Sequence, residues 1–293
     1  MTATPIAHVG ILVSDLERAK EHWSKVLGES FSPFVRYRPA SWSYRGEFTP
    51  GVPGVNELRQ TIYLGVNPSI EIQQYVENGT HSKNRGEGGH HIGFQPVADT
   101  KLRRKELENL KIRIAGAVNY QDREIIQFTE HDDLDNVSTE WVELSKGHLD
   151  LKDDGTDVNR LPDGSGTIFE LETIRAINNV RPNSNIKEII INVRDLVDSL
   201  SKWASVTGQT FSKLDSRTPV ALSDGEGAKL RLIEATSSDS RIGIIKLVFQ
   251  CEDLAQKRQN LLNNKVPITL DTLHNILIDG EYLNNVQVEF TDK

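Results

Sequence analysis

An internal repeat constrains the fold of this chain more than any other feature of its sequence. Residues 8–32 and residues 188–212 carry the same landmarks in the same order and without a gap, each pair 180 positions apart. The landmarks are Asp15-Leu16, Trp23, Gly28 and Phe31-Ser32 in the first copy, and Asp195-Leu196, Trp203, Gly208 and Phe211-Ser212 in the second. Because self-similarity at a fixed spacing is typical of a repeated structural unit, the chain is expected to contain copies of one module.

Each copy has the pattern of a strand followed by a helix. Residues 9–13 and 189–193 are apolar runs, which are typical of strands buried on both faces, and the aspartate that follows each run can cap a helix. In the first copy, apolar residues then recur at helical spacing until Gly28. Three β-rich segments come next, most clearly 60–65 and 69–76. The module is therefore predicted to be βαβββ.

Two further segments resemble weaker copies of this module. Residues 90–97 lead into a helical pattern at 102–110 and strand patterns at 125–128 and 139–144. Residues 243–251 lead into a helix ending near residue 263 and strands at 276–279 and 286–290. Four modules in two pairs predict an α+β fold with a first domain at 1–150 and a second at 151–293. The turn-rich segment 146–185 is expected to be the linker, with a strand at 168–173.

Composition excludes several classes of protein. A chain of 293 residues is long enough for two domains, and 34 basic against 42 acidic residues, without a basic cluster, argue against a nucleic-acid partner. The single cysteine, Cys251, rules out an intramolecular disulfide and a thiolate metal site. No basic, apolar leader and no run of about 18 apolar residues is present, so neither a membrane span nor secretion is expected, and we predict a cytoplasmic protein.

Four ionisable residues stand inside strands that otherwise look buried. His8 and His91 lie at the start of the first strands of modules one and two, while Glu71 and Glu143 lie in the last strands of the same modules. If the modules pair about a local twofold axis, equivalent positions converge on one concave face. Two imidazoles and two carboxylates suit one divalent ion such as Mn, Co, Ni, Fe(II) or Zn. The alternative is that all four are ordinary strand residues facing solvent.

The sequence also resembles a known family, the vicinal oxygen chelate superfamily of glyoxalase I, methylmalonyl-CoA epimerase, extradiol dioxygenases, and fosfomycin-resistance and bleomycin-binding proteins. The resemblance is clearest over four segments, namely 8–28 (HVGILVSDLERAKEHWSKVLG), 70–74, 88–95 (GGHHIGFQ) and 141–145. It implies paired βαβββ modules around a cupped sheet, glyoxalase/bleomycin resistance/dioxygenase-like. It also implies a small-molecule substrate, with a carbonyl or other oxygen groups.

The doubled histidine of GGHHIGF resembles the epimerase more than glyoxalase I. Both families place metal ligands at the positions of His8, Glu71, His91 and Glu143, which implies a metal-dependent isomerase, epimerase or lyase that moves a proton next to a carbonyl through a metal-stabilised enolate. By this resemblance, Glu143 is the ligand that doubles as the base, and Glu71 is its counterpart. His90 should point away from His91, because neighbours on a strand face opposite sides, and a supporting role suits it better than ligation.

The second pair of modules lacks this ligand set. The matched positions hold Glu188, Arg231, Lys246 and Glu289, two acids and two bases that can neutralise each other. We therefore expect ion pairs in place of a metal, with anion binding by Arg231 and Lys246 as the alternative. The second pair could also supply the interface of a homodimer, or only internal packing.

Segment 31–60 is rich in aromatic, proline, glycine and arginine residues. It could fold over the concave face as a lid that uses Arg36, Arg38 and Arg45 to bind an acidic substrate, or it could be a long solvated connection. Two other functions stay open at this point. One is an Fe(II)-dependent dioxygenase using His8, His91 and one glutamate, and the other is a non-catalytic binding or resistance protein.

Overall fold

The structure, a computed structural model, describes residues 4–37, 41–50, 58–120, 123–143, 179–213, 220–225, 227–237 and 240–292. The residues up to 143 are called the first half below, and those from 179 the second half. The predicted boundary near residue 150, most of the predicted linker and the predicted strand at 168–173 lie outside the described residues, so the division into domains stays a prediction.

In the first half, the described elements are β1 (Ile6–Val13), α1 (Leu16–Leu27), β2 (Val35–Tyr37), β3 (Ser41–Tyr44), β4 (Glu47–Pro50), β5 (Leu58–Tyr63), β6 (Val66–Asn67), β7 (Ser69–Gln74), η1 (Lys83–Arg85), β8 (Gly88–Phe94), α2 (Thr100–Asn109), β9 (Ile114–Tyr120), β10 (Arg123–Thr129), η2 (His131–Leu134) and β11 (Ser138–Val142). In the second half they are β12 (Ser184–Val193), α4 (Leu196–Thr207), β13 (Phe211–Lys213), β14 (Val220–Ser223), β15 (Lys229–Glu234), β16 (Gly243–Gln250), α5 (Leu254–Asn263), β17 (Ile268–Asp271), β18 (Asn275–Ile278), η3 (Gly280–Leu283) and β19 (Gln287–Thr291).

These strands form two sheets whose orders repeat one rule. The first sheet runs β2-β5-β7-β1-β8-β11-β10-β9-β3-β4 and the second β13-β14-β15-β12-β16-β19-β18-β17, with β6 pairing β12. In all four modules the first strand pairs in parallel with the last, and the first strands of each pair of modules meet as antiparallel neighbours, β1 with β8 and β12 with β16. The predicted α+β fold of paired βαβββ modules with cupped sheets is confirmed.

Aspartate begins each of the four α-helices in the described segments, as the sequence indicates. Asp15, Asp99, Asp195 and Asp253 are the N-cap residues, and each side chain accepts a hydrogen bond from a backbone N–H of the first turn. Trp23 of α1 and Trp203 of α4 are fully buried against the core. The repeat landmarks therefore mark where the helices start and which face packs on the sheet.

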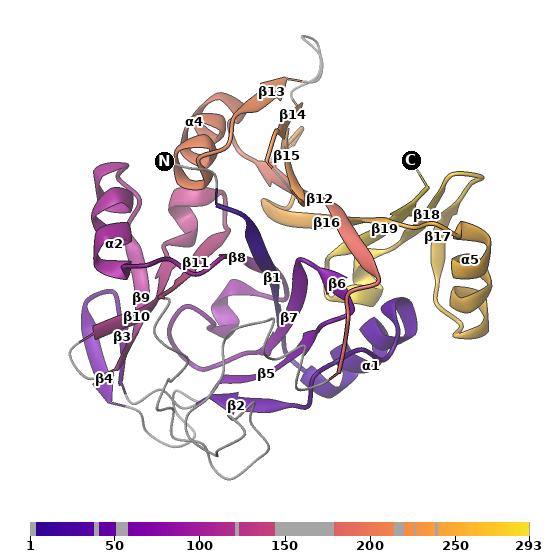
Figure 1. Ribbon diagram of the computed structural model, residues 1–293, viewed down its shortest axis with the longest axis horizontal. Coiled ribbons are helices and arrows are strands. Elements are labelled where there is room, and N and C mark those ends of the chain that lie inside the picture. Colours follow the sequence, from indigo (N-terminus) through magenta and orange to yellow (C-terminus); the bar gives the residue numbers. More distant parts are fainter. Residues whose placement is uncertain are drawn as a thin grey trace.

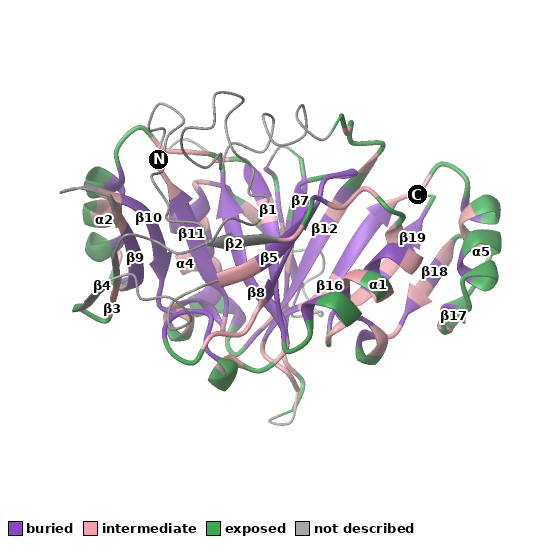
Figure 2. Ribbon diagram, turned by 90° about the horizontal axis from the view of Figure 1, so that it is seen from below, coloured by how far each residue is buried: buried purple, intermediate pink, exposed green. Residues whose placement is uncertain are grey.

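The two sheets lie side by side, with α2 and α5 at opposite ends of the molecule (Figure 1). Most of the strand surface is buried, while much of α2 and α5 faces outward (Figure 2). The sheets touch at β8 and β16, where a Cβ added to Gly89 would come within 2.4 Å of Ile244 Cβ. None of the helices in the described segments has both the length and the apolar character needed to span a membrane.

Residues 41–50 do not form a lid. They form the hairpin β3–β4, and β3 pairs antiparallel with β9 at the border of the first sheet. Arg45 at its turn binds the carboxylate of Glu130, at 2.7 Å from Nε and 3.1 Å from Nη2. Its guanidinium group is therefore paired within the protein. Covering an open sheet edge explains why this segment becomes strand. The side chains of Arg36 and Arg38 lie outside the described residues.

Candidate metal centre

Four side chains meet on the concave face of the first sheet: His8, Glu71, His91 and Glu140. The Nε2 atoms of the two histidines lie 3.0 Å apart, and each is 3.0 Å from Glu140 Oε2. Glu71 Oε2 lies 3.6 Å from His8 Nε2 and 3.3 Å from His91 Nε2. Each module thus contributes one imidazole and one carboxylate, and three of the four predicted residues come together.

Two glycines make room for the imidazoles. His8 stands opposite Gly93 on the neighbouring strand, and His91 stands opposite Gly10. A Cβ added to Gly10 would lie 1.9 Å from His91 Cε1, and one added to Gly93 would lie 2.0 Å from His8 Cε1. Each ring therefore lies across the backbone of the other module's first strand. A residue larger than glycine at the opposite position would occupy the space of the ring.

Strand alternation selects the two carboxylates. Ile70 and Ile72 pack into the core, so Glu71 between them faces the concave side. Trp141 is likewise in the core, where it stacks on Phe94 with ring centroids 4.4 Å apart, and its neighbour Glu140 faces the cluster. The two glutamates are therefore equivalents in their modules.

The prediction for Glu143 needs correction. Glu143 lies three residues after Glu140. Because successive side chains of an extended segment point to opposite faces of the sheet, this odd separation places Glu143 on the face opposite Glu140. Its Oε2 accepts a hydrogen bond of 3.1 Å from Thr100 Oγ1, the first residue of α2, away from the cluster. The sequence offered a signal that would have found Glu140: I-E-I around Glu71 and T-E-W around Glu140 both place a glutamate beside a core residue.

Charges within the cluster compensate one another. Burial alone would lower the pKa of His91, but the carboxylates of Glu140 and Glu71 outweigh burial and raise the pKa to about 9. Burial alone would raise the pKa of Glu140, but the charges and hydrogen bonds of His8 and His91 hold it well below its usual range. The carboxylates thus favour a proton on His91, and a bound cation would be stabilised by the same two carboxylates.

The two carboxylates differ in their support. Glu71 accepts hydrogen bonds from Gln60 Nε2 at 2.5 Å and from Gln73 Nε2 at 2.9 Å. Among the described residues, the carboxylate of Glu140 has only His8 and His91 as hydrogen-bonding or ionic partners. Glu71 is therefore fixed, and Glu140 is held by the cluster alone.

His90 does not point away from His91, contrary to the prediction. The register slips at this point, since Gly10 pairs with His91 and Ile11 with Gly89, which leaves His90 as the extra residue of a β-bulge. The bulge turns its ring toward His91, with 2.9 Å between the two Nδ1 atoms. Alternation fails here because a bulge breaks the two-residue period of the strand.

The donor set fits a single divalent ion. Ligand atoms about 2.1 Å from an ion lie about 3.0 Å apart at right angles and about 3.4 Å apart in a tetrahedron. Five of the six donor pairs lie between 3.0 and 3.6 Å, and all four atoms lie within 4.8 Å of one another. Nitrogen and carboxylate oxygen donors suit Zn, Ni, Co, Mn or Fe(II), and their chemistry does not choose among these metals.

The second sheet keeps the register of this site and changes its chemistry. Ile190 pairs with Arg231 and with Lys246, as Gly10 pairs with Glu71 and with His91, and Glu188 pairs with Val248, as His8 pairs with Gly93. Arg231 binds Glu188 at 2.6 Å and Lys246 binds Glu289 at 3.0 Å. The expected ion pairs are present at the matched positions.

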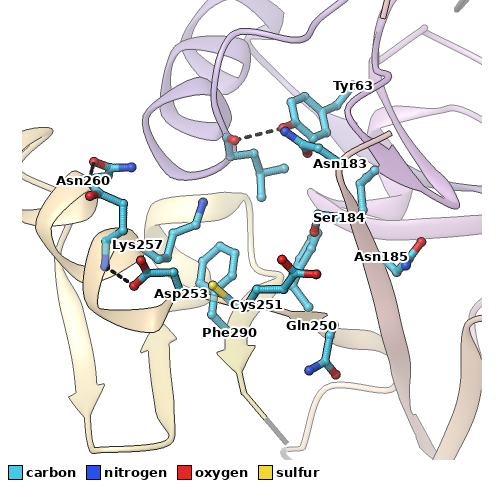
Figure 3. A pocket seen from close by; sticks show the side chains of 15 residues that line it. Tyr63, Asn183, Ser184, Asn185, Gln250, Cys251, Asp253, Lys257, Asn260 and Phe290 are labelled. Atoms are coloured by element: carbon cyan, nitrogen blue, oxygen red, sulfur yellow. Dashed lines mark hydrogen bonds between the residues drawn. The ribbon is translucent and has the colours of Figure 1, made fainter. Parts of the chain in front are cut away.

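Two cavities accompany these features. One, of about 240 Å³, lies in the first half, with Arg85, His131 and Ser138 in its wall. The other, of about 300 Å³, lies between the halves, and its wall includes Tyr63 of the first half and Cys251, Lys257 and Phe290 of the second (Figure 3). In neither cavity does the wall include one of the four cluster residues.

Comparison with known proteins finds one family model that matches the first half. Residues 7–128 match the model of the Glyoxalase/Bleomycin resistance/Dioxygenase superfamily, a stretch that includes His8, Glu71 and His91 and ends before Glu140. Over these residues the chain is similar to that superfamily, the vicinal oxygen chelate superfamily, in agreement with the resemblance in the sequence. No curated protein matches the sequence.

Solved structures share the arrangement of both halves. A mutant of 4-hydroxymandelate synthase from Streptomyces coelicolor is similar at a TM-score of 0.62 and 12% identity, covering 99% of this chain and 92% of that one. A hypothetical protein from Staphylococcus aureus is similar at 0.55 and 9%, covering 97% and 98%. A fusion of a xylose isomerase-like TIM barrel with 4-hydroxyphenylpyruvate dioxygenase is similar at 0.56 and 9%, covering 99% of this chain and 48% of that one. At these identities the likeness concerns the fold.

Proposed function

We propose that this protein is a metal-dependent isomerase, epimerase or lyase that transfers a proton at the carbon next to a carbonyl group. One observation carries the proposal, namely that two modules bring two imidazoles and two carboxylates together around one point. The ligands would be His8, Glu71, His91 and Glu140. Similarity of residues 7–128 to a largely enzymatic superfamily supports an enzyme but not this particular reaction.

The number of protein donors favours proton transfer. Four donors leave two positions of a six-coordinate ion, enough for two neighbouring substrate oxygens. A bound divalent ion would supply Lewis-acid polarisation of the carbonyl, which makes the adjacent C–H more acidic. The protein fixes Glu71 through two glutamine side chains, so that carboxylate is suited to holding its place.

Glu140 is the proposed base. Its carboxylate is ionised, because His8 and His91 hold its pKa well below the usual range, and among the described residues no amide or hydroxyl restrains it. It can therefore turn from the cluster toward a substrate carbon, accept a proton there and return it. Burial of Glu140 and His91 keeps bulk water from competing for that proton.

The test is proton exchange in deuterium oxide. With metal-loaded protein and a panel of 2-oxo, 2-hydroxycarbonyl and acyl-thioester compounds, NMR should show deuterium entering the carbon next to the carbonyl. Glu140→Gln should slow the exchange by about 10²–10⁴-fold, as expected for loss of a general base. Glu143→Gln, a matched change just past the end of the same strand and away from the cluster, should exchange at the wild-type rate. Full activity of Glu140→Gln would refute its role as the base.

An Fe(II)-dependent dioxygenase is the second candidate. The similar structures named for 4-hydroxymandelate synthase and 4-hydroxyphenylpyruvate dioxygenase favour it, since each likeness covers 99% of this chain. Oxygen-activating iron sites commonly use two histidines and one carboxylate, which leaves three open positions, whereas this cluster has a fourth donor. Oxygen consumption that requires Fe(II) and substrate, without deuterium exchange, would establish the dioxygenase instead.

A further inference from the structure

His90 is bound on both sides of its ring. Its Nδ1 lies 2.9 Å from His91 Nδ1, and its Nε2 lies 2.7 Å from the carbonyl oxygen of Thr80. Both histidines are almost completely buried, at 1% and 0% exposure, so water does not offer them alternative partners. The ring of His90 therefore connects the backbone at Thr80 to the side of His91 that faces away from the cluster.

The positions of the hydrogen atoms follow from these partners. A carbonyl oxygen only accepts, so His90 Nε2 must donate to Thr80. A neutral His90 then has a lone pair on Nδ1, and the hydrogen between the two Nδ1 atoms belongs to His91. When His91 gives up its second proton, as binding an ion requires, its lone pair is therefore on Nε2, the atom 3.0 Å from Glu140 Oε2 and 3.3 Å from Glu71 Oε2.

We propose that His90 is a positioning residue, which fixes the tautomer and the ring orientation of His91 and thereby sets the affinity of the cluster for its ion. The inference rests on the proposed metal function. A hydrogen-bonded partner on the outer nitrogen also makes an imidazole a stronger donor. His8 contrasts with His91, because within the described ranges no residue bonds its Nδ1 atom.

The second sheet shows that the bulge does not depend on histidine. There Ile190 pairs with Lys246 and Ile191 with Ile244, so Ile245 is the extra residue at the matched place. The same backbone thus accepts isoleucine where the neighbouring residue is a lysine bound to Glu289. In the first half both the bulge residue and the residue after it are histidines, His90 and His91, whereas in the second half they are Ile245 and Lys246.

A competing interpretation is a second metal ion. His81, His90 and His91 each offer a nitrogen within 4.8 Å of the others. Such an ion would need lone pairs on both Nδ1 atoms of His90 and His91, which would remove the hydrogen that joins them. His91 would also have to give Nδ1 to this ion and Nε2 to the first one, whereas a neutral imidazole has only one lone pair for ligation, so the observations favour the positioning role.

Two substitutions separate these possibilities. His90→Ile places at the bulge the residue of the second sheet and removes both hydrogen bonds. His90→Asn keeps an acceptor near the position of Nδ1, because the asparagine side-chain oxygen can occupy it. Titration of metal-free protein with Co²⁺ should give a Kd weaker by about 10–100-fold for His90→Ile, as for other losses of a ligand's supporting partner. His90→Asn should recover most of that affinity.

A second readout detects the hydrogen bond itself. In Co²⁺-loaded protein, the proton on His91 Nδ1 should appear as a strongly shifted, slowly exchanging NMR signal in the wild type and in His90→Asn. It should exchange rapidly or disappear in His90→Ile. Urea unfolding of the metal-free variants checks that the fold is retained, and because this signal reports on local geometry, a purely global loss of stability would not remove it.

The outcomes are distinct. An unchanged Kd together with an unchanged signal in His90→Ile would overturn the positioning role and leave the proposed function intact. Two Co²⁺ ions per wild-type chain, reduced to one by His81→Ala, would overturn it in favour of the second metal site. A wild-type chain that binds no ion would end both this inference and the proposed function.

Discussion

At the scale of single residues, the absence of a side chain at Gly10 and Gly93 matters as much as the ligands themselves. Each glycine lies under the imidazole contributed by the other module, and an added Cβ would overlap that ring. Backbone contacts give these positions little freedom to shift, because both lie in the central antiparallel pair β1–β8. The ligand positions are therefore set by pairs of residues, a histidine and the glycine opposite.

Gly10→Ala should weaken metal binding while the fold survives. The new methyl group displaces the ring of His91, so we expect the Kd for Co²⁺ or Zn²⁺ to rise by about 10–100-fold, a loss like that from disturbing a ligand's support. Competition with a chelating dye measures the Kd, and thermal unfolding of the metal-free variant checks the fold. Ile190→Ala, at the matched position of the second sheet, is the control and should leave the Kd unchanged. Wild-type affinity in Gly10→Ala would show that the ring does not need this space.

Metal affinity should also depend on pH. In the metal-free protein the pKa of His91 is raised to about 9, so below that pH the ion has to displace a proton. Apparent affinity should therefore rise as pH increases, by up to about tenfold per unit below pH 9, and level off above it. Calorimetric titrations between about pH 6.5 and pH 9.5 measure this slope and the protons released. An affinity that is constant over this range would mean that His91 is already deprotonated.

The residue scale also shows where sequence reasoning fails. Choosing Glu143 instead of Glu140 is an error of three positions, and it selects the wrong face because β-strand side chains alternate. The core position of Trp141 would have corrected it. The orientation of His90 had no such signal, since the bulge arises from pairing between β1 and β8 rather than from the local sequence.

At the scale of elements, the repeat predicted the four modules well because each begins with a local signal, an apolar strand followed by an aspartate-capped helix. It did not predict that β3 and β4 would extend the first sheet, because that hairpin pairs with β9, about 75 residues further along the chain. Pairing between distant segments leaves little trace in either segment alone. The insertion within module one therefore looked like a loop.

The matched registers of the two sheets lead to a further prediction, that the second site can be rebuilt. Glu188→His, Arg231→Glu and Lys246→His, with Glu289 retained, restore the four donors. Ile190→Gly and Val248→Gly open the space that Gly10 and Gly93 provide in the first sheet. The five-fold variant should bind one more ion per chain than the wild type, as measured by equilibrium dialysis with elemental analysis.

The control for this variant keeps Ile190 and Val248. Its donors are complete, but the imidazoles cannot lie across the opposite strand, so we expect it to bind the additional ion far more weakly. Equal binding by the two variants would show that the imidazoles can bind the ion without the space that the glycines provide. Circular dichroism and thermal unfolding establish that both variants are folded.

At the scale of the whole molecule, the two halves are joined by reciprocal contacts, in which equivalent residues of each half bind the other half. Trp23 Nε1 in the first half donates to Asn284 Oδ1 in the second at 3.3 Å, and Trp203 Nε1 donates to Asp135 Oδ2 at the same distance. Lys257 Nζ of α5 donates to the carbonyl of Val26 near the end of α1, a favourable place for a cation. The two tryptophan contacts join module one to module four and module three to module two, so they are equivalent when the two halves are exchanged.

Asp135 and Asn284 accept the two tryptophan hydrogen bonds between the halves. Both adopt the left-handed backbone conformation, with φ of 52° and 55°, which asparagine and aspartate tolerate better than most residues. Asp135 also accepts a bond from the backbone N–H of Arg194 at 3.2 Å. Its side chain therefore joins one turn of the first half to two groups of the second.

Asp135→Ala should destabilise the entire chain. The change removes both bonds, leaves the buried Trp203 N–H without its partner and places alanine at a positive φ, so we expect a loss of about 1–3 kcal/mol in the free energy of unfolding. Urea unfolding followed by tryptophan fluorescence measures it. Asp135→Asn, which copies the residue of the matched turn, should lose less because its oxygen can still accept from Trp203. If the halves support each other, unfolding stays a single transition in both variants, because neither half retains its partner once the other opens. A second transition in Asp135→Ala, with one half unfolding before the other, would show that the half unfolding last is stable without these exchanged contacts.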